Sequence, residues 1–364
     1  MALTCYICLW LSVFLSQRFM QEQPHLIELG LARLKLMEAF SLISLKRQVS
    51  QNFWWVIRTD PHLDERMKQP LLALLKNCSN HILIATNEIP KSQLEGLKTV
   101  KPKQVWSGNL QQAWQYIQET EASPSRLVLE TRLDADDGLH RRFVERMQAS
   151  ARQSLHDAWR FWCTERHVEW QYASAWESTE KNDLDSPGSI VSLQFLGCIT
   201  AGLTAGYFEN SPSSQTLPVI PHHELHRTLP ECGKDGAKPQ SKCWSYLKLV
   251  PGALRARTPT SAGMWNVLWR SEDNTTHSVQ AQGPNRYLSG AAKQQVHQEK
   301  LWQAVQMFFG MSREQGKDIR EYVKQHLRLI AADNLKGQCT KDHSCKNSTQ
   351  QILKKIIESS ENVN

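Results

Sequence analysis

Short apolar runs alternate with helical stretches along the first 150 residues, and this alternation leaves few folds open to the chain. Strands are expected over residues 53–57, 81–85 and 126–133, and helices over residues 27–43, 67–75 and 110–117. The helical stretches are recognised by apolar residues that recur every three or four positions. Strands that alternate with helices favour parallel βαβ units, whose ligands bind beyond the carboxyl ends of the strands.

The first sixteen residues are strongly apolar. No run in the chain reaches the roughly 18 apolar residues that a membrane span needs, and this segment lacks the basic start of a typical signal peptide. We expect residues 11–15 to form the first buried strand, after a fragment of a leader. Membrane association is left open at this point.

Beyond residue 150 the pattern changes. Residues 159–176 alternate as in a β-hairpin and carry six aromatic side chains, which more often form a core than a surface for sugar rings. These are Trp159, Phe161, Trp162, Trp170, Tyr172 and Trp176. Further strands are expected over residues 190–208, and the segment after residue 293 is helical by its pattern.

Charge and cysteine content restrict the partners and leave the compartment open. Lys and Arg number 43 and Asp and Glu 36, which gives a net charge of +7 spread along the chain. With no basic stripe or recognisable module, nucleic acid is disfavoured and a phosphorylated small molecule fits better. Cys232 with Cys243 and Cys339 with Cys345 bracket polar loops, so disulfides and reduced cysteines are both open.

Residues 131–140 read Thr-Arg-Leu-Asp-Ala-Asp-Asp-Gly-Leu-His and place Asp134, Asp136 and Asp137 within four positions. Crowded carboxylates repel one another unless a cation compensates their charge. Oxygen ligands suit Mg²⁺ or Mn²⁺, which would neutralise a diphosphate leaving group. An EF-hand calcium loop is excluded, because Gly138 falls one position too early for its glycine. A solvated helix N-terminus is the alternative.

This segment resembles the Asp-x-Asp region of GT-A-type glycosyltransferases and, more narrowly, the rhamnosyltransferase family, whose members carry a similar Thr-Arg-Leu-Asp-x-Asp-Asp-x-Leu-His. QRFM at residues 17–20 and FWWVIRTDP at residues 53–61 are similar to that family's first two strands, and the resemblance continues loosely through PHHEL and RTPTSAGM. It implies a GT-A-like (Rossmann-like) α/β fold, with a mixed, mostly parallel sheet flanked by helices and a helical C-terminal extension.

The resemblance implies a glycosyltransferase that moves a sugar from a nucleotide-sugar donor to a glycan or other hydroxyl acceptor with the help of Mn²⁺ or Mg²⁺. Inversion at the sugar is implied only by the family, and the sugar, rhamnose among the options, is left open. The expected parts are residues 1–16 with a leader and the first strand, residues 10–150 as the nucleotide-sugar-binding half, residues 151–292 as the acceptor-side half, and residues 293–364 as the extension. Paired cysteines favour a secretory lumen such as the Golgi, and the cytoplasm is the alternative.

The resemblance also assigns roles to residues on the donor side. Asp60 matches the carboxylate that contacts the nucleoside, although an Asp-Pro turn would explain it equally. Asp134 would face the ribose or the metal, Asp136 would bind the metal directly, and Asp137 is the alternative ligand. Arg18 and Arg132 would pair with phosphates or form surface salt bridges, since a guanidinium matches phosphate in a bidentate fork.

An inverting transfer needs a general base for the acceptor hydroxyl, and the candidates are Glu165 and Glu224. His222 and His223 precede Glu224 as further metal ligands or as loop histidines without one. Two other classes stay open. A metal-dependent phosphohydrolase would use the same carboxylates and histidines, and a non-catalytic carbohydrate-binding protein would use the Trp-rich hairpin and a bound cation.

Overall fold

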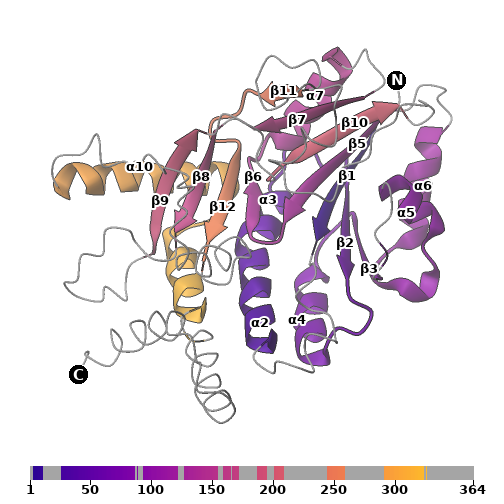
Figure 1. The fold of residues 1–364 in the computed structure, drawn as a ribbon, viewed down its shortest axis with the longest axis horizontal. Helices are drawn as coiled ribbons and strands as arrows, with labels where there is room; N and C mark the ends of the chain where they lie inside the picture. Colours follow the sequence, from indigo (N-terminus) through magenta and orange to yellow (C-terminus); the bar gives the residue numbers. More distant parts are fainter. Residues whose placement is uncertain are drawn as a thin grey trace, which may run out of the picture.

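The computed structural model describes residues 3–10, 26–86, 88, 93–121, 127–154, 159–164, 166–171, 187–194, 201–208, 244–258, 291–323 and 325. Within these residues the chain forms two sheets that lie side by side, with α2 (Leu26–Met37) and α3 (Ile43–Lys46) at their junction (Figure 1). The first strand, β1 (Leu3–Trp10), lies earlier than expected. Residues 11–15, which we expected to form that strand, lie outside the described residues.

The larger sheet has eight strands in the order β11-β7-β10-β5-β1-β2-β3-β4. Their bounds are β2 Trp54–Thr59, β3 His81–Ala85, β4 Val105–Gly108, β5 Leu127–Asp134, β7 Trp159–Thr164, β10 Leu203–Phe208 and β11 Trp244–Leu247. β1, β2, β3 and β5 are parallel neighbours, whereas β4 and β10 run against them. The expected α/β class, with a mixed and mostly parallel sheet flanked by helices, is confirmed.

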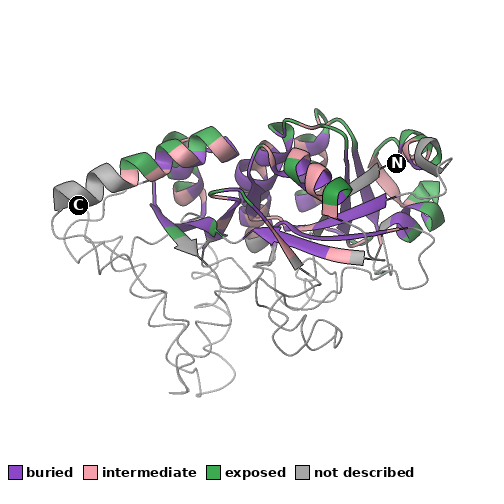
Figure 2. Ribbon diagram, turned by 90° about the horizontal axis from the view of Figure 1, so that it is seen from above, coloured by how far each residue is buried: buried purple, intermediate pink, exposed green. Residues whose placement is uncertain are grey.

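The central strands are buried on both faces, which is why they read as continuous apolar runs. In β2, Trp55 and Ile57 pack into one core with α2, α4 (Glu65–Leu75) and α7 (Phe143–Ser154). Trp54 and Val56 point the other way, into a core with α5 (Gln93–Thr99) and α6 (Leu110–Glu121). Figure 2 shows the buried strands beneath helices whose outer faces are exposed. The sheet is therefore the middle of three layers.

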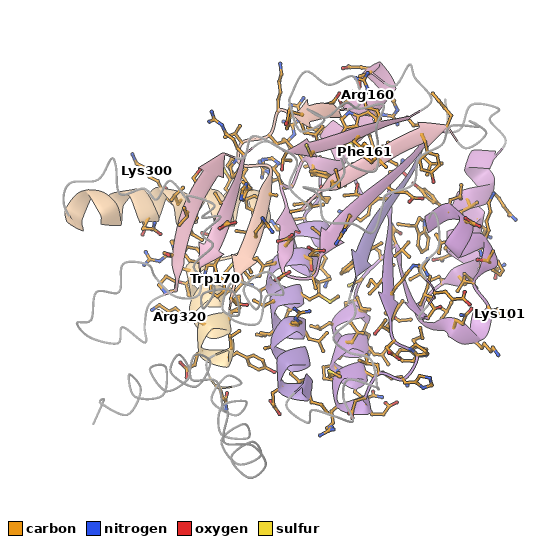
Figure 3. All side chains as sticks on the ribbon, viewed as in Figure 1. Lys101, Arg160, Phe161, Trp170, Lys300 and Arg320 are labelled. Carbon is orange, nitrogen blue, oxygen red and sulfur yellow. The ribbon has the colours of Figure 1, made fainter. Side chains whose placement is uncertain are left out.

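The smaller sheet has four strands in the order β6-β12-β8-β9. Their bounds are β6 Asp137–Leu139, β8 Arg166–Gln171, β9 Ser189–Gln194 and β12 Ala253–Arg257. One face, with Val168, Trp170 and Leu254, packs on α10 (Ala291–Phe309) and on the helical residues 313–323. Figure 3 shows Trp170 where this sheet meets the C-terminal helices. The helical C-terminal extension is confirmed over residues 291–323.

The predicted hairpin over residues 159–176 is wrong. β7 pairs with β10 and β11 in the larger sheet, whereas β8 pairs with β12 and β9 in the smaller one. The physical reason is the connection, because residue 165 alone separates the two strands and the tightest hairpins need a two-residue turn. Phe161, Trp162 and Trp170 are fully buried, so their assignment to the core is confirmed.

The predicted halves are not separate sheets. β7, β10 and β11 come from the later half and complete the sheet that β1 to β5 begin. The boundaries at residues 150 and 292 stay predictions. Among the described helices, none combines the length and the apolar character needed to cross a bilayer.

Candidate active site at the acidic turn

Three strand ends align at one edge of the larger sheet. Trp10, the last residue of β1, pairs with Asp134 of β5 on one side and with Arg58 of β2 on the other. The chain leaves β5 through an acidic turn, defined here as residues 134–137, and enters β6. Asp60 comes one residue after the end of β2. Neighbouring strands are about 4.8 Å apart, so the ends that carry Asp60 and Asp134 are separated by about 10 Å.

Asp60 is engaged in a local turn. Its Oδ1 accepts a hydrogen bond from His62 N at 2.7 Å, and its carbonyl oxygen accepts one from Leu63 N at 3.2 Å. Such an Asx-turn reverses the chain after the strand. The turn that the sequence suggested for this residue is therefore present, and the contact of Asp60 with a nucleoside stays a prediction.

Hydroxyl groups hold the acidic turn from the helix side. Ser41 Oγ donates to the carbonyl oxygen of Ala135 at 2.9 Å. Ser44 Oγ accepts a hydrogen bond from Leu139 N at 3.1 Å and donates to the carbonyl oxygen of Ser41 at 2.9 Å. Both serines are fully buried. A Cβ on Gly138 would lie 3.2 Å from the carbonyl oxygen of Phe40, so the turn fits closely against the helix.

The two serines sit in and beside a π-helical turn, η1 (Glu38–Leu42), that interrupts the helix between α2 and α3. A π turn inserts an extra residue and rotates the next helical turns about the axis, and such turns often mark functional sites. The rotation explains a departure from the predicted apolar stripe, because Ile43 is only half-buried whereas Leu42 and Leu45 are buried.

Charged side chains hold the same turn from the strand side. Asp137 and Arg255 are direct partners across β6 and β12, and their side chains approach to 3.8 Å. Arg255 also lies 3.8 Å from Glu169 of β8. The backbone takes part, since Ala256 N donates to the carbonyl oxygen of Asp136 at 2.9 Å. Asp137 is only 3% exposed and Glu169 6%, so this row of charges lies inside the protein.

Asp134 is more accessible than Asp137 and Glu169, with 36% of its side chain exposed, and Arg132 approaches it to 3.7 Å. Removal from bulk water raises the pKa of Asp134, the positive charge of Arg132 opposes this, and the negative charge of Asp136 adds to it. Burial lowers the pKa of Arg33 on α2, against the charges of Asp136 and Asp134. Arginines therefore supply much of the compensating charge that we expected from a cation.

His140 closes the far end of β6. Its Nδ1 accepts a hydrogen bond from Arg142 N at 3.0 Å, and its ring stacks on Phe308 with 4.7 Å between centroids. Burial, with the nearby charges of Arg141, Arg142 and Arg146, lowers the pKa of His140 to about 4. The imidazole is therefore neutral at physiological pH, and its role is to pack the β6 end against α10.

Five of the ten predicted site residues lie together at this edge of the sheet: Asp60, Arg132, Asp134, Asp136 and Asp137. The other five, Arg18, Glu165, His222, His223 and Glu224, lie outside the described residues, as do both predicted cysteine pairs. In the part of the chain that the structure covers, no three His, Cys, Asp or Glu side chains converge as a ready metal cage. The metal-ligand assignments therefore stay predictions.

The sequence did not single out the residues around the turn. Ser41, Ser44 and Arg255 hold it directly, Arg33 acts on it through charge, and Glu169 lies beyond Arg255. A weak signal existed for two of them. Charged and apolar residues alternate in β8 (RHVEWQ) and β12 (ALRAR), as in strands with one polar face. Nothing local indicated that these faces would meet the acidic turn.

Residues 29–168 match the family described as "Putative rhamnosyl transferase". This segment includes β2 to β5, the acidic turn and both serines. No curated protein matches the chain.

The chain also shows a distant likeness to solved structures of S. aureus TarS. TarS 1-349 in complex with UDP-GlcNAc is 10% identical, with 90% of this chain and 80% of that chain covered and a TM-score of 0.27. TarS 1-349 in complex with UDP is 10% identical, with 100% and 88% covered and a TM-score of 0.25. Superpositions this loose carry no argument here. Residues 29–168 are therefore similar to the rhamnosyl transferase family, and this match supports the expected glycosyltransferase class.

Proposed function

We propose that the protein transfers a sugar from a nucleotide-sugar donor to a hydroxyl acceptor, with a divalent metal at the acidic turn and with inversion at the anomeric carbon. The observation that carries the proposal is the acidic turn itself, placed at the carboxyl edge shared by β1, β2 and β5. Ligands of open α/β sheets bind beyond this edge. The family match over the same segment supports the reaction class.

The carboxylates of the turn differ in how well they suit a metal. Asp134 keeps 36% of its side chain exposed, and Asp136 is half-buried. Both therefore offer hard oxygen ligands within reach of solvent, as Mn²⁺ or Mg²⁺ requires. When bound, the ion would stabilise the negative charge of the departing diphosphate. Asp137 is buried beside Arg255, so we assign the metal to Asp136, with Asp134 facing the metal or the ribose.

Other side chains would hold the remaining parts of the donor and activate the acceptor. Asp60, about 10 Å along the edge from Asp134, contacts the nucleoside. Arg132, and Arg18 from the segment after β1, pair with phosphate oxygens through bidentate hydrogen bonds. Glu224 or Glu165 removes the proton from the acceptor hydroxyl as its oxygen attacks the sugar, with His222 and His223 beside Glu224.

The test is a thermal-shift panel of nucleoside diphosphates and nucleotide sugars, with and without Mn²⁺, on the wild type and on Asp136→Asn. A ligand that binds only the folded state raises the melting temperature. We expect one nucleotide class to raise it in a metal-dependent way, and the variant to lose that rise. Absence of a shift with every nucleotide would contradict the proposal, and release of phosphate from simple esters would replace it with a phosphohydrolase activity.

We also propose a secretory lumen as the compartment. Cys163 of β7 is fully buried and disulfide-bonded, which an oxidising compartment favours, whereas Cys78 is a free thiol. Alkylation of the denatured, unreduced protein followed by mass spectrometry should label Cys78 and leave Cys163 unlabelled. Labelling of both would contradict this assignment.

A further inference from the structure

Arg255 is the centre of a buried row of charges that crosses the smaller sheet. Its side chain is 17% exposed and lies between two carboxylates that are more deeply buried, with 3.8 Å to Asp137 on one side and 3.8 Å to Glu169 on the other. Beyond Glu169, His167 Nε2 lies 3.4 Å from Glu169 Oε1. The four residues come from β6, β12 and β8, which are neighbours in the sheet.

The contacts of Arg255 are loose for a buried ion pair. At 3.8 Å they are longer than hydrogen bonds, and within the described residues its Nε donates no hydrogen bond. A guanidinium in this position responds to the charges on either side without being fixed to one of them. Loss of one carboxylate would therefore shift it toward those that remain. Asp134 is among them, because it lies three residues before Asp137, the direct cross-strand partner of Arg255, and the positive charge of Arg255 opposes the rise that burial causes in its pKa.

The backbone on both sides of Asp137 is already fixed. Ala256 N holds the carbonyl oxygen of Asp136, and Ser44 Oγ holds Leu139 N. Asp137 is thus anchored in the β6–β12 ladder with its side chain directed along the sheet to Arg255, whereas Asp134 and Asp136 lie in the strand end and the turn before it.

We propose that Asp137 and Arg255 form a positioning pair, in which Asp137 holds Arg255 away from Asp134 and does not itself bind the metal or the donor. This inference rests on the proposed function, because it divides the three carboxylates of the acidic turn into two that face the ligand and one that orders them. Residues that support metal ligands in this way typically change metal affinity by 10- to 100-fold when they are replaced.

The experiment measures the Mn²⁺-dependent affinity for the best nucleoside diphosphate of the panel by calorimetry. Asp136→Asn should lower that affinity more than 100-fold, and Asp137→Asn by about 10-fold. The double variant Asp137→Asn with Arg255→Gln should bind with an affinity within about threefold of the wild type, because it lacks the positive charge that Asp137 would otherwise hold in place. Addition of Arg255→Lys should not restore it, since the charge remains. Glu145→Gln, which neutralises a carboxylate paired with Arg142 away from the turn, is the matched control and should change nothing.

Either of two results would overturn the proposal. One is a loss in Asp137→Asn as large as in Asp136→Asn that Arg255→Gln does not reverse, which would make Asp137 a ligand. The other is no change in Asp137→Asn beyond twofold. Both single Asn variants are isosteric with Asp, so this comparison survives even where Arg255→Gln does not fold.

Failure of the proposed function would give a different result, because the wild type itself would then bind no nucleotide, with or without Mn²⁺. In that case the pair is tested by urea unfolding of the two single variants and the double variant. A coupling of at least tenfold in the unfolding equilibrium constant between Asp137→Asn and Arg255→Gln would support the interaction of the two side chains. A coupling below twofold would show that they do not act as a pair.

Discussion

The two sheets of this protein differ in the side chains that they bury. The central strands of the larger sheet are apolar on both faces, and β2 has no exposed residue along its length. The smaller sheet is apolar only toward α10, while its other face carries Asp137, Arg255 and Glu169. The larger sheet therefore supplies the stable frame, and the smaller one places charge beside the acidic turn. A buried charge row stabilises little by itself, because desolvation offsets its attraction.

The largest expected effect concerns the two apolar cores. Trp162→Ala in the larger sheet and Trp170→Ala in the smaller one each remove a fully buried indole, which should cost about 3–5 kcal/mol in the free energy of unfolding. Urea denaturation followed by circular dichroism measures this cost. If the sheets unfold as one unit, both variants shift a single transition. A transition that splits only in Trp170→Ala would show that the smaller sheet unfolds on its own.

The hydroxyl side of the acidic turn comes next. Ser44→Ala leaves the buried Leu139 N–H without its acceptor, which should cost about 1–3 kcal/mol. Ser154→Ala is the control, because the Ser154 hydroxyl donates within α7, to the carbonyl oxygen of Ser150 at 2.8 Å. Equal midpoints for the two variants in urea would mean that Ser44 does not hold the turn.

His140 makes stability depend on pH at the junction between β6 and α10. Its pKa is about 4 in the folded protein and near 6.5 when unfolded. Between these values the unfolded chain binds more protons, so stability falls as the pH drops from 6.5 toward 4, by at most about 1.4 kcal/mol per pH unit. His140→Asn retains a hydrogen-bond acceptor and should flatten this dependence. An unchanged slope in the variant would assign it to other groups.

The smallest effect is expected for charges at the surface. Lys35 and Glu38 pair at 2.8 Å where α2 meets η1, and both side chains are more than a third exposed. Lys35→Ala should change the free energy of unfolding by no more than about 0.5 kcal/mol. Added salt should also affect this pair more than the buried row around Arg255. A loss of more than roughly 1 kcal/mol in the free energy of unfolding would show that this exposed ion pair stabilises the fold more than exposed pairs usually do.

The sequence predicts the parallel part of the fold well. β2 and β3 read as continuous apolar runs because helices cover both of their faces, and the stripe from Ile27 to Phe40 marks α2 and η1. The acidic turn was recognisable for a different reason, since three carboxylates within four positions are hard to accommodate without a function.

The features that the sequence could not predict depend on contacts between distant segments. β8 begins one residue after β7 but pairs with β12, almost 90 residues later. The alternation in β8 indicates one polar face and says nothing about its partner. A helical pattern likewise cannot distinguish a regular turn from η1, and that single inserted residue brings Ser41 to Ala135. The acidic turn and its place at the edge of the sheet were thus predictable, and the groups that order the turn were not.

The central claim is that the acidic turn binds the diphosphate of a nucleotide sugar. The most direct test is a crystal structure of the protein in complex with Mn²⁺ and the nucleoside diphosphate that gives the largest thermal shift. Anomalous diffraction data collected at the manganese edge would locate the metal. We predict one anomalous peak at about 2.1 Å from a carboxylate oxygen of Asp136, bridged to the diphosphate, with the base and ribose toward Asp60. A nucleotide bound away from the edge formed by β1, β2 and β5, or a metal held by Asp137 instead, would contradict the account.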